Sequence, residues 1–171
     1  MRVVHLLSAV AVLGLLAGCG DDPTAGAPAD QGAVLDANAS VLRVVDGDTI
    51  VASIGGDEER VRLIGINTPE SVDPRRPVEC YGIEASDHAK ELLPEGTAIR
   101  IERDAEARDR YDRLLGYVYR ATDGLFVNLA MVEDGYAQVM TYPPNVTHTA
   151  QFVAAQASAR ERSVGLWGNC P

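Results

Sequence analysis

Residues 59–70 read Glu-Arg-Val-Arg-Leu-Ile-Gly-Ile-Asn-Thr-Pro-Glu and form the most informative stretch of the chain. Residues 59–66 have the period of a β-strand, with Val61 and Leu63 on one face and Arg62 on the other. Pro69 ends the strand, since proline has no N–H group to donate to a neighbouring strand. An arginine among core-forming residues is costly unless its charge meets a partner or a ligand. The end of this strand is therefore a candidate functional site.

Similar periodicity predicts the other elements of the fold. Strands are expected at residues 40–45, 49–54, 97–102 and 114–119, an extended segment at 136–141, and helices at 81–93, 126–133 and 147–161. Asp-Gly and Gly-Gly pairs mark turns between them. Five strands interleaved with three helices in a chain of this size predict an α+β protein built on a small closed barrel, and the OB-fold is one such barrel.

The composition fits one domain with an appended segment. The chain has 171 residues, of which 46% are hydrophobic and 23% are charged, so it can bury a core and is not disordered throughout. Its formal charge is −10, from 25 acidic and 15 basic residues. A uniformly acidic surface would repel nucleic acid, so a role in nucleic-acid chemistry requires the arginines to cluster. Several arginines do lie in or beside the motifs described below, namely Arg62, Arg75, Arg76, Arg103, Arg108, Arg110 and Arg113.

Residues 1–18 are predicted to be a signal peptide. The apolar run at residues 6–17 is too short to span a bilayer but has the length of a signal-peptide core. It ends in Leu-Ala-Gly-Cys, which resembles the bacterial lipobox, so cleavage before Cys19 and lipidation of that residue are expected. Lipid chains on Cys19 would hold an exported protein at the cell membrane, on the extracytoplasmic side. A conventional secretory peptide with an incidental cysteine is the alternative.

Residues 19–39 are expected to be a flexible linker that follows the lipidated cysteine. They are rich in Ala, Gly, Pro and Asp and contain no aromatic residue, so they cannot build a core. Residues 40–171 are then the folded domain.

Cys80 and Cys170 are expected to form a disulfide, because an exported domain with two distant cysteines most simply pairs them. A catalytic cysteine is the sharper alternative, but no arrangement of cysteine with histidine and asparagine or aspartate supports it. No Cys-x-x-Cys or His-x-x-x-His spacing occurs, so a zinc site is not expected.

Five motifs occur in a fixed order along the domain. They are Val-Val-Asp-Gly-Asp-Thr (44–49), Arg-Leu-Ile-Gly-Ile-Asn-Thr-Pro-Glu (62–70), Val-Glu-Cys-Tyr-Gly-Ile-Glu-Ala-Ser (78–86), Asp-Arg-Tyr-Asp-Arg (109–113) and Asn-Val-Thr-His (145–148). In this order and spacing they resemble the staphylococcal nuclease (thermonuclease) family, over a region from about residue 40 to Trp167. The resemblance implies an OB-fold five-stranded β-barrel with three helices. It also implies calcium-dependent hydrolysis of DNA and RNA to products ending in 3′-phosphates.

The resemblance gives catalytic roles to Arg62, Glu70 and Arg113. The two arginines would fork onto the scissile phosphate and stabilise the charge that develops on it, which suits planar guanidinium groups. Glu70 would align the attacking water and accept its proton.

The same resemblance makes Asp48, Asn67 and the carbonyl oxygen of Thr68 ligands of Ca²⁺, a hard cation that takes oxygen ligands. Asn67 stands where the family usually has an aspartate. It keeps a ligand oxygen but loses a negative charge, so weaker calcium binding is expected.

Three further residues are expected to contact substrate. Arg110 and Tyr111 resemble the residues that hold the terminal phosphate of the nucleotide, and Tyr142 resembles an aromatic residue of the base pocket. A partly buried barrel residue is the alternative for Tyr142. Met140 falls where the family tends to place a second tyrosine, so base stacking is expected to be reduced.

The leading hypothesis is a monomeric, surface-tethered, calcium-dependent nuclease that acts on DNA and RNA, preferably single-stranded or denatured. The alternative is a catalytically weak or inactive OB-fold lipoprotein that binds nucleic acid, since OB-folds support binding as readily as chemistry. Glu70 favours the enzyme, because a binding protein has no use for an acid beside a bound phosphate.

Overall fold

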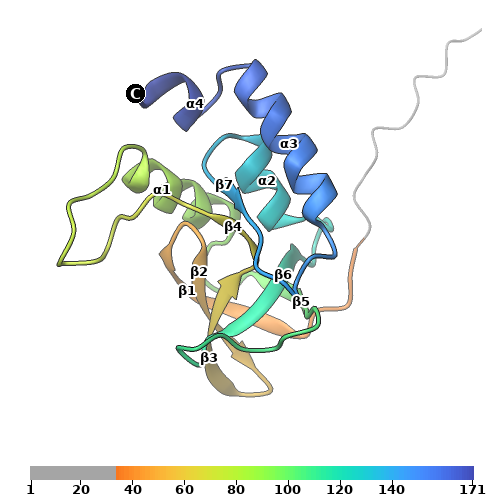
Figure 1. Ribbon diagram of the computed structural model, residues 1–171. Coiled ribbons are helices and arrows are strands. Elements are labelled where there is room, and N and C mark those ends of the chain that lie inside the picture. The colour runs from red at the N-terminus through yellow and green to blue at the C-terminus, as the bar shows by residue number, and fades with distance from the viewer. Residues whose placement is uncertain (1–33) are drawn as a thin grey trace, which may run out of the picture. The chain divides into compact units, whose positions relative to one another are not determined.

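The structure, a computed structural model, describes residues 34–171. The predicted signal peptide, Cys19 and most of the predicted linker lie outside these residues. Five strands form a closed barrel in the order β1-β2-β3-β6-β5 (Figure 1): β1 (Ala39–Asp46), β2 (Thr49–Ile54), β3 (Asp57–Leu63), β5 (Ala98–Glu102) and β6 (Leu114–Arg120). The antiparallel pairing of β1 with β5 closes the barrel, and β3 runs parallel to β6. The five-stranded OB-fold barrel that the sequence predicts is confirmed.

The helices pack outside the barrel. The three predicted helices are present as α1 (Gly82–Leu92), α2 (Val127–Glu133) and α3 (Thr149–Glu161), and a short helix that was not expected, α4 (Leu166–Asn169), follows them. In Figure 1, α2 and α3 lie together beyond one end of the barrel. Two short strands, β4 (Gly65–Asn67) and β7 (Gln138–Met140), pair with each other in a separate antiparallel sheet. In the part of the chain that the structure describes, no helix has the length and apolar character needed to cross a membrane.

The single strand expected at residues 59–66 is in fact two strands, which corrects the sequence prediction. β3 ends at Leu63 and β4 begins at Gly65, whose φ of +82° lies in the left-handed region that favours glycine. The ring of Phe152 from α3 occupies the space that a side chain at this position would need. The chain therefore leaves the barrel at Gly65 and pairs with β7. The bend brings Thr68 against the β1–β2 turn, where its N–H group donates to Asp48 Oδ2 at 3.0 Å.

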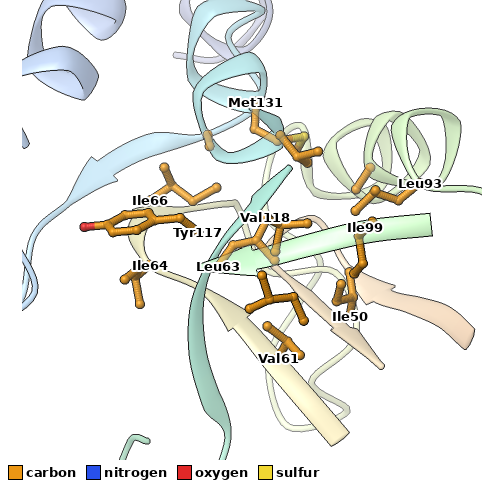
Figure 2. Packing of buried hydrophobic residues seen from close by; sticks show 14 of the residues in the cluster. Ile50, Val61, Leu63, Ile64, Ile66, Leu93, Ile99, Tyr117, Val118 and Met131 are labelled. Carbon is orange, nitrogen blue, oxygen red and sulfur yellow. The ribbon is translucent and has the colours of Figure 1, made fainter. Parts of the chain in front are cut away.

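The barrel interior and the helices share one hydrophobic core. Figure 2 shows Ile50, Val61 and Val118 of the barrel strands with Leu93, which follows α1, and Met131 of α2. Each of these side chains is almost completely buried. The same core includes Ala89 of α1 and Phe152 of α3, so it joins the barrel to three of the helices.

One buried polar residue fastens α2 to the bend. Asn128 is fully buried, and its Oδ1 accepts a hydrogen bond from the Val118 N–H group at 2.9 Å. Its Nδ2 donates to the carbonyl oxygen of Ile64 at 2.9 Å. A buried amide with both ends bonded fixes its neighbours firmly, so α2 helps to hold the residue at which the chain leaves the barrel.

Candidate active site

A cleft of about 700 Å³ lies over the β1–β2 turn and the bend between β3 and β4. The loop between β5 and β6 and the segment after β7 form its other walls. It is lined by every residue with a predicted catalytic, metal-binding or substrate-binding role: Asp48, Arg62, Asn67, Thr68, Glu70, Arg110, Tyr111, Arg113 and Tyr142. The fold therefore brings together side chains from widely separated parts of the sequence. The predicted lipidation site, Cys19, lies outside the described residues.

Arg62 is held by oxygen atoms of the protein. Its Nη2 lies 2.8 Å from Asp48 Oδ2, in an ion pair whose side chains are only 14% and 8% exposed. Nη2 also donates to the carbonyl oxygen of Ile66 at 2.9 Å, and Nη1 donates to that of Leu63. Burial lowers the pKa of Arg62 and Asp48 opposes this shift, but an arginine remains protonated in a protein. The end of β3 thus presents a fixed positive charge to the cleft.

Asp46 and Asp48 place two carboxylates at the β1–β2 turn. The Asp48 N–H group donates to Asp46 Oδ1 at 3.1 Å, and Asp48 Oδ1 accepts from the Thr49 hydroxyl at 3.1 Å. Burial, with the nearby charge of Asp48, raises the pKa of Asp46 to about 6. Two crowded carboxylates favour a proton or a cation between them. Sequence reasoning assigned a role to Asp48 alone, although the Asp-Gly-Asp motif contains both residues.

Arg113 lies in the cleft wall before β6, where Asp109 holds it. Asp109 Oδ2 is 2.8 Å from Arg113 Nε and 2.7 Å from Nη2, while Oδ1 accepts from the backbone N–H groups of Tyr111 and Arg113. Burial raises the pKa of Asp109, but these hydrogen bonds outweigh it and keep that pKa below its ordinary value. A carboxylate on the Nε side of a guanidinium leaves the Nη1 hydrogens for a second acceptor such as phosphate. Asp109 belongs to the Asp-Arg-Tyr-Asp-Arg motif, but the spacing of that motif does not predict its contact with Arg113.

The outer part of the cleft is aromatic and basic. Tyr111 and Tyr142 are 64% and 70% exposed, so Tyr142 is not the partly buried barrel residue of the alternative interpretation. Arg110 Nη2 donates to the Tyr111 hydroxyl at 2.6 Å, and its guanidinium carbon lies 4.7 Å from the centre of the Tyr111 ring. Exposed rings beside arginines are suited to stack on bases while the cations contact phosphates.

Glu70 lies near the start of the loop between β4 and α1. Its Oε1 accepts hydrogen bonds from the N–H groups of Val72 at 2.8 Å and Asp73 at 3.0 Å. These bonds, that of Val72 above all, lower the pKa of Glu70 although partial burial opposes them. The side chain is therefore an ionised carboxylate at neutral pH, the form in which it can accept a proton.

The oxygen atoms beside Arg62 have the chemistry of a calcium site. Asp46, Asp48, Asn67 and Thr68 offer carboxylate, amide and carbonyl oxygens to the cleft, and calcium prefers such ligands. No group of three or more His, Cys, Asp and Glu side chains in residues 34–171 could hold a metal ion, so a site here needs the amide or carbonyl oxygen. Asn67 Nδ2 donates to the Thr68 carbonyl oxygen at 3.2 Å, and Asn67 Oδ1 accepts from Arg62 Nη2 at 3.3 Å. The donor set fits calcium, but the carboxylate oxygens of Asp48, the amide oxygen of Asn67 and the carbonyl oxygen of Thr68 all accept other hydrogen bonds.

Cys80 and Cys170 are joined in a disulfide. The bond connects the loop before α1 with the residue after α4, across a sequence separation of 90 residues. A small pocket of about 210 Å³ beside both cysteines is lined by Asn67 and Pro69 as well. The disulfide and the segment that leads from β4 to Glu70 thus line the same small pocket.

Known proteins resemble this chain over most of the described domain. A family model described as "Staphylococcal nuclease homologue" matches residues 60–169, which include every residue of the cleft except Asp46 and Asp48. A thermonuclease of Staphylococcus intermedius is 41% identical over 127 residues, covering 74% of this chain and 74% of the relative. A thermonuclease of Staphylococcus hyicus is 37% identical over 129 residues, covering 75% of each chain. The endonuclease YncB of Bacillus subtilis is 34% identical over 145 residues, covering 84% of this chain and 67% of the relative.

Proposed function

The chain belongs to the staphylococcal nuclease family and is a nuclease, and we propose that it hydrolyses phosphodiester bonds of both DNA and RNA with the aid of calcium. The observation that carries the proposal is the presence of Arg62, Glu70 and Arg113 in one cleft with the carboxylate of Asp48. Phosphodiester hydrolysis needs cations that stabilise charge on the phosphate and a group that accepts a proton from water. The cleft offers both.

In the proposed reaction a water molecule attacks phosphorus in line with the 5′-oxygen of the leaving nucleotide. Glu70 aligns this water and accepts one of its protons as the new P–O bond forms. The bond between phosphorus and the 5′-oxygen breaks, its electron pair stays on that oxygen, and the oxygen then takes up a proton. The products are a 3′-phosphate and a 5′-hydroxyl.

The two arginines divide the work of binding the phosphate. Arg62 is fixed by Asp48 and by two carbonyl oxygens, so its charge needs little rearrangement when the phosphate gains charge. Arg113 is held by Asp109 through Nε and Nη2, which directs the remainder of its guanidinium to a second acceptor. Calcium, when bound by Asp48, Asn67 and Thr68, would add positive charge beside the same phosphate.

The exposed aromatic residues suggest the form of the substrate. Tyr111 and Tyr142 are mostly exposed at the outer cleft, where unpaired bases could stack on them. Each base stacked on an aromatic ring contributes about 1–3 kcal/mol in other single-strand-binding proteins. Met140 has no ring to stack on a base, so we expect the affinity for substrate to be modest. Because Tyr111 and Tyr142 can stack on unpaired bases, we expect a preference for single-stranded or denatured nucleic acid. We expect a monomer of this chain to bind it.

The proposal is tested by incubating the protein with denatured DNA or RNA in calcium or in a chelator. Acid-soluble product is measured and its termini are identified. Calcium-dependent release of products with 3′-phosphate ends is expected, and Glu70→Ala and Arg62→Ala should abolish it. Arg43→Ala, which removes an exposed arginine paired with Glu58 on the barrel surface, should retain it. Binding without release at any calcium concentration would instead favour the alternative of a catalytically inactive nucleic-acid-binding protein.

We further propose that the protein acts outside the cytoplasm, tethered to the membrane through lipid on Cys19. The lipobox-like Leu-Ala-Gly-Cys and the linker-like composition of residues 19–39 support this location. Incorporation of labelled palmitate into the parent protein but not into a Cys19→Ser variant tests it. Equal recovery of both proteins in the soluble fraction would contradict it.

A further inference from the structure

The loop at residues 71–78 is flanked by Glu70 and Glu79, which are joined by two hydrogen bonds. The Glu70 N–H group donates to Glu79 Oε2 at 3.0 Å, and the Glu79 N–H group donates to the Glu70 carbonyl oxygen at 2.9 Å. Both backbone polar groups of Glu70 are therefore held by one residue. That residue lies nine positions later, on the opposite side of the loop.

The loop between these glutamates has little packing of its own. Val72 and Val78 are 51% and 54% exposed, and Arg75 pairs with Asp73 inside the loop, at 2.9 Å. Few buried contacts and exposed backbone allow a segment to move. The direction of the Glu70 carboxylate, which is set by N–H groups of this same loop, thus depends on how the loop is closed at its base.

Glu79 makes two further contacts, and the residue after it is part of the disulfide. Its Oε1 lies 2.6 Å from Arg76 Nη2, and its carbonyl oxygen accepts from the Gly82 N–H group at 3.0 Å. Gly82 packs so closely that a Cβ added there would lie 2.6 Å from the Glu70 carbonyl oxygen. The next residue along the chain, Cys80, is bonded to Cys170 and so ties this segment to the C-terminal end of the domain.

We propose that Glu79 is a positioning residue for Glu70, and that the Cys80–Cys170 disulfide anchors it. The proposal rests on the catalytic role given to Glu70 above. Glu79 touches neither substrate nor the reacting atoms. It closes the base of the loop through the carboxylate–amide bond, and this closure fixes the backbone from which the Glu70 carboxylate reaches the attacking water.

The test compares four variants of the purified full chain: Glu79→Ala, Glu79→Gln, Glu84→Ala and Glu70→Ala. Glutamine keeps a side-chain oxygen that can accept the Glu70 N–H group, whereas alanine does not. Glu84 is an exposed glutamate in the first turn of α1 and serves as the matched control. Steady-state kcat and KM on denatured DNA and the midpoint of thermal unfolding are measured for each variant.

Glu79→Ala should lower kcat by about 10- to 100-fold with KM nearly unchanged, as expected when a reacting group is displaced by up to about 1 Å. Its unfolding midpoint should stay close to that of the parent, because the lost hydrogen bond is at the surface. Glu79→Gln should recover most of kcat, and Glu84→Ala should match the parent.

Three results would overturn the proposal in different ways. Parental kcat in Glu79→Ala, with Glu70→Ala inactive, would remove the positioning role and leave the proposed reaction intact. An active Glu70→Ala variant would remove the catalytic role of Glu70 and the positioning role with it. A Glu79→Gln variant as slow as Glu79→Ala would also refute the hydrogen-bond argument.

Discussion

Replacing Arg62 with methionine should destabilise the protein far more than the same change at Arg43. Both arginines form an ion pair with a carboxylate at nearly the same distance, 2.8 Å for Arg62 with Asp48 and 2.9 Å for Arg43 with Glu58. They differ in exposure, since the first pair is 14% and 8% exposed and the second 58% and 57%. Arg62 also donates to two carbonyl oxygens, so the comparison measures the combined effect of the buried ion pair and of these hydrogen bonds.

The expected magnitudes follow from what each change leaves behind. Loss of Arg62 leaves Asp48 buried without its cation, which typically costs about 3–5 kcal/mol of folding free energy. Loss of Arg43 leaves Glu58 in water, and exposed pairs contribute at most about 1 kcal/mol. Methionine preserves most of the side-chain volume, so a cavity should add little at either position.

Urea denaturation followed by circular dichroism, in the presence of a chelator, gives the free energy of unfolding for each variant. A double variant, Arg62→Met with Asp48→Asn, removes both charges and should be more stable than Arg62→Met alone. Equal losses for Arg62→Met and Arg43→Met, or a double variant less stable than the single one, would refute the idea that an unpaired buried carboxylate causes the loss.

Three further predictions concern pH, calcium and the disulfide. The pKa of Asp46 is about 6 in the folded state against an ordinary 3.8, so its ionisation opposes folding and the free energy of unfolding should fall as pH rises between these values. Asp46→Asn should reduce this fall in urea titrations at about pH 4 and about pH 8, and an equal fall in both proteins would contradict the pKa given to Asp46. Asn67→Asp should tighten calcium binding severalfold in calorimetry, because it adds a negative charge and frees the Thr68 carbonyl oxygen from its hydrogen bond with the Asn67 amide. An unchanged affinity for calcium would exclude residue 67 as a ligand. Replacing Cys80 and Cys170 with serine should lower the free energy of unfolding by about 4–5 kcal/mol, because the disulfide closes a loop of 90 residues in the unfolded chain. Urea titration measures the loss, and a change below about 1 kcal/mol would mean that the unfolded chain is compact even without the disulfide.

The barrel could be predicted from the sequence because its strands carry a local signal. Alternating apolar residues in residues 40–54 and 97–119 match strands that the structure contains, with ends shifted by a residue or two. The division of the strand at 59–66 could not be predicted in this way. It depends on the left-handed backbone at Gly65 and on the ring of Phe152, which is distant in sequence and packs against it only in the folded chain.

The residues of the cleft were predictable because their motifs combine charged side chains with strand ends. The contacts that hold those side chains were not. Asp109 reaches Arg113 through an irregular loop, and spacing does not reveal the direction of a side chain in such a loop. The raised pKa of Asp46 comes from its burial beside Asp48, and the spacing of residues in a turn does not reveal burial. The pairing of Glu70 with Glu79 likewise appears only once the loop between them is closed.

The contact between Phe152 and Gly65 has a consequence for the order in which the enzyme becomes active. All residues that line the cleft precede α3 in the chain, yet the bend that brings Thr68 to Asp48 is packed against a side chain of α3. A nascent chain that ends before residue 149 would carry every group of the reaction but would lack the Phe152 ring that packs against the bend. A nuclease made on a ribosome is surrounded by RNA. Because a side chain of α3 packs against this bend, we expect the cleft to take shape only after α3 has left the ribosome.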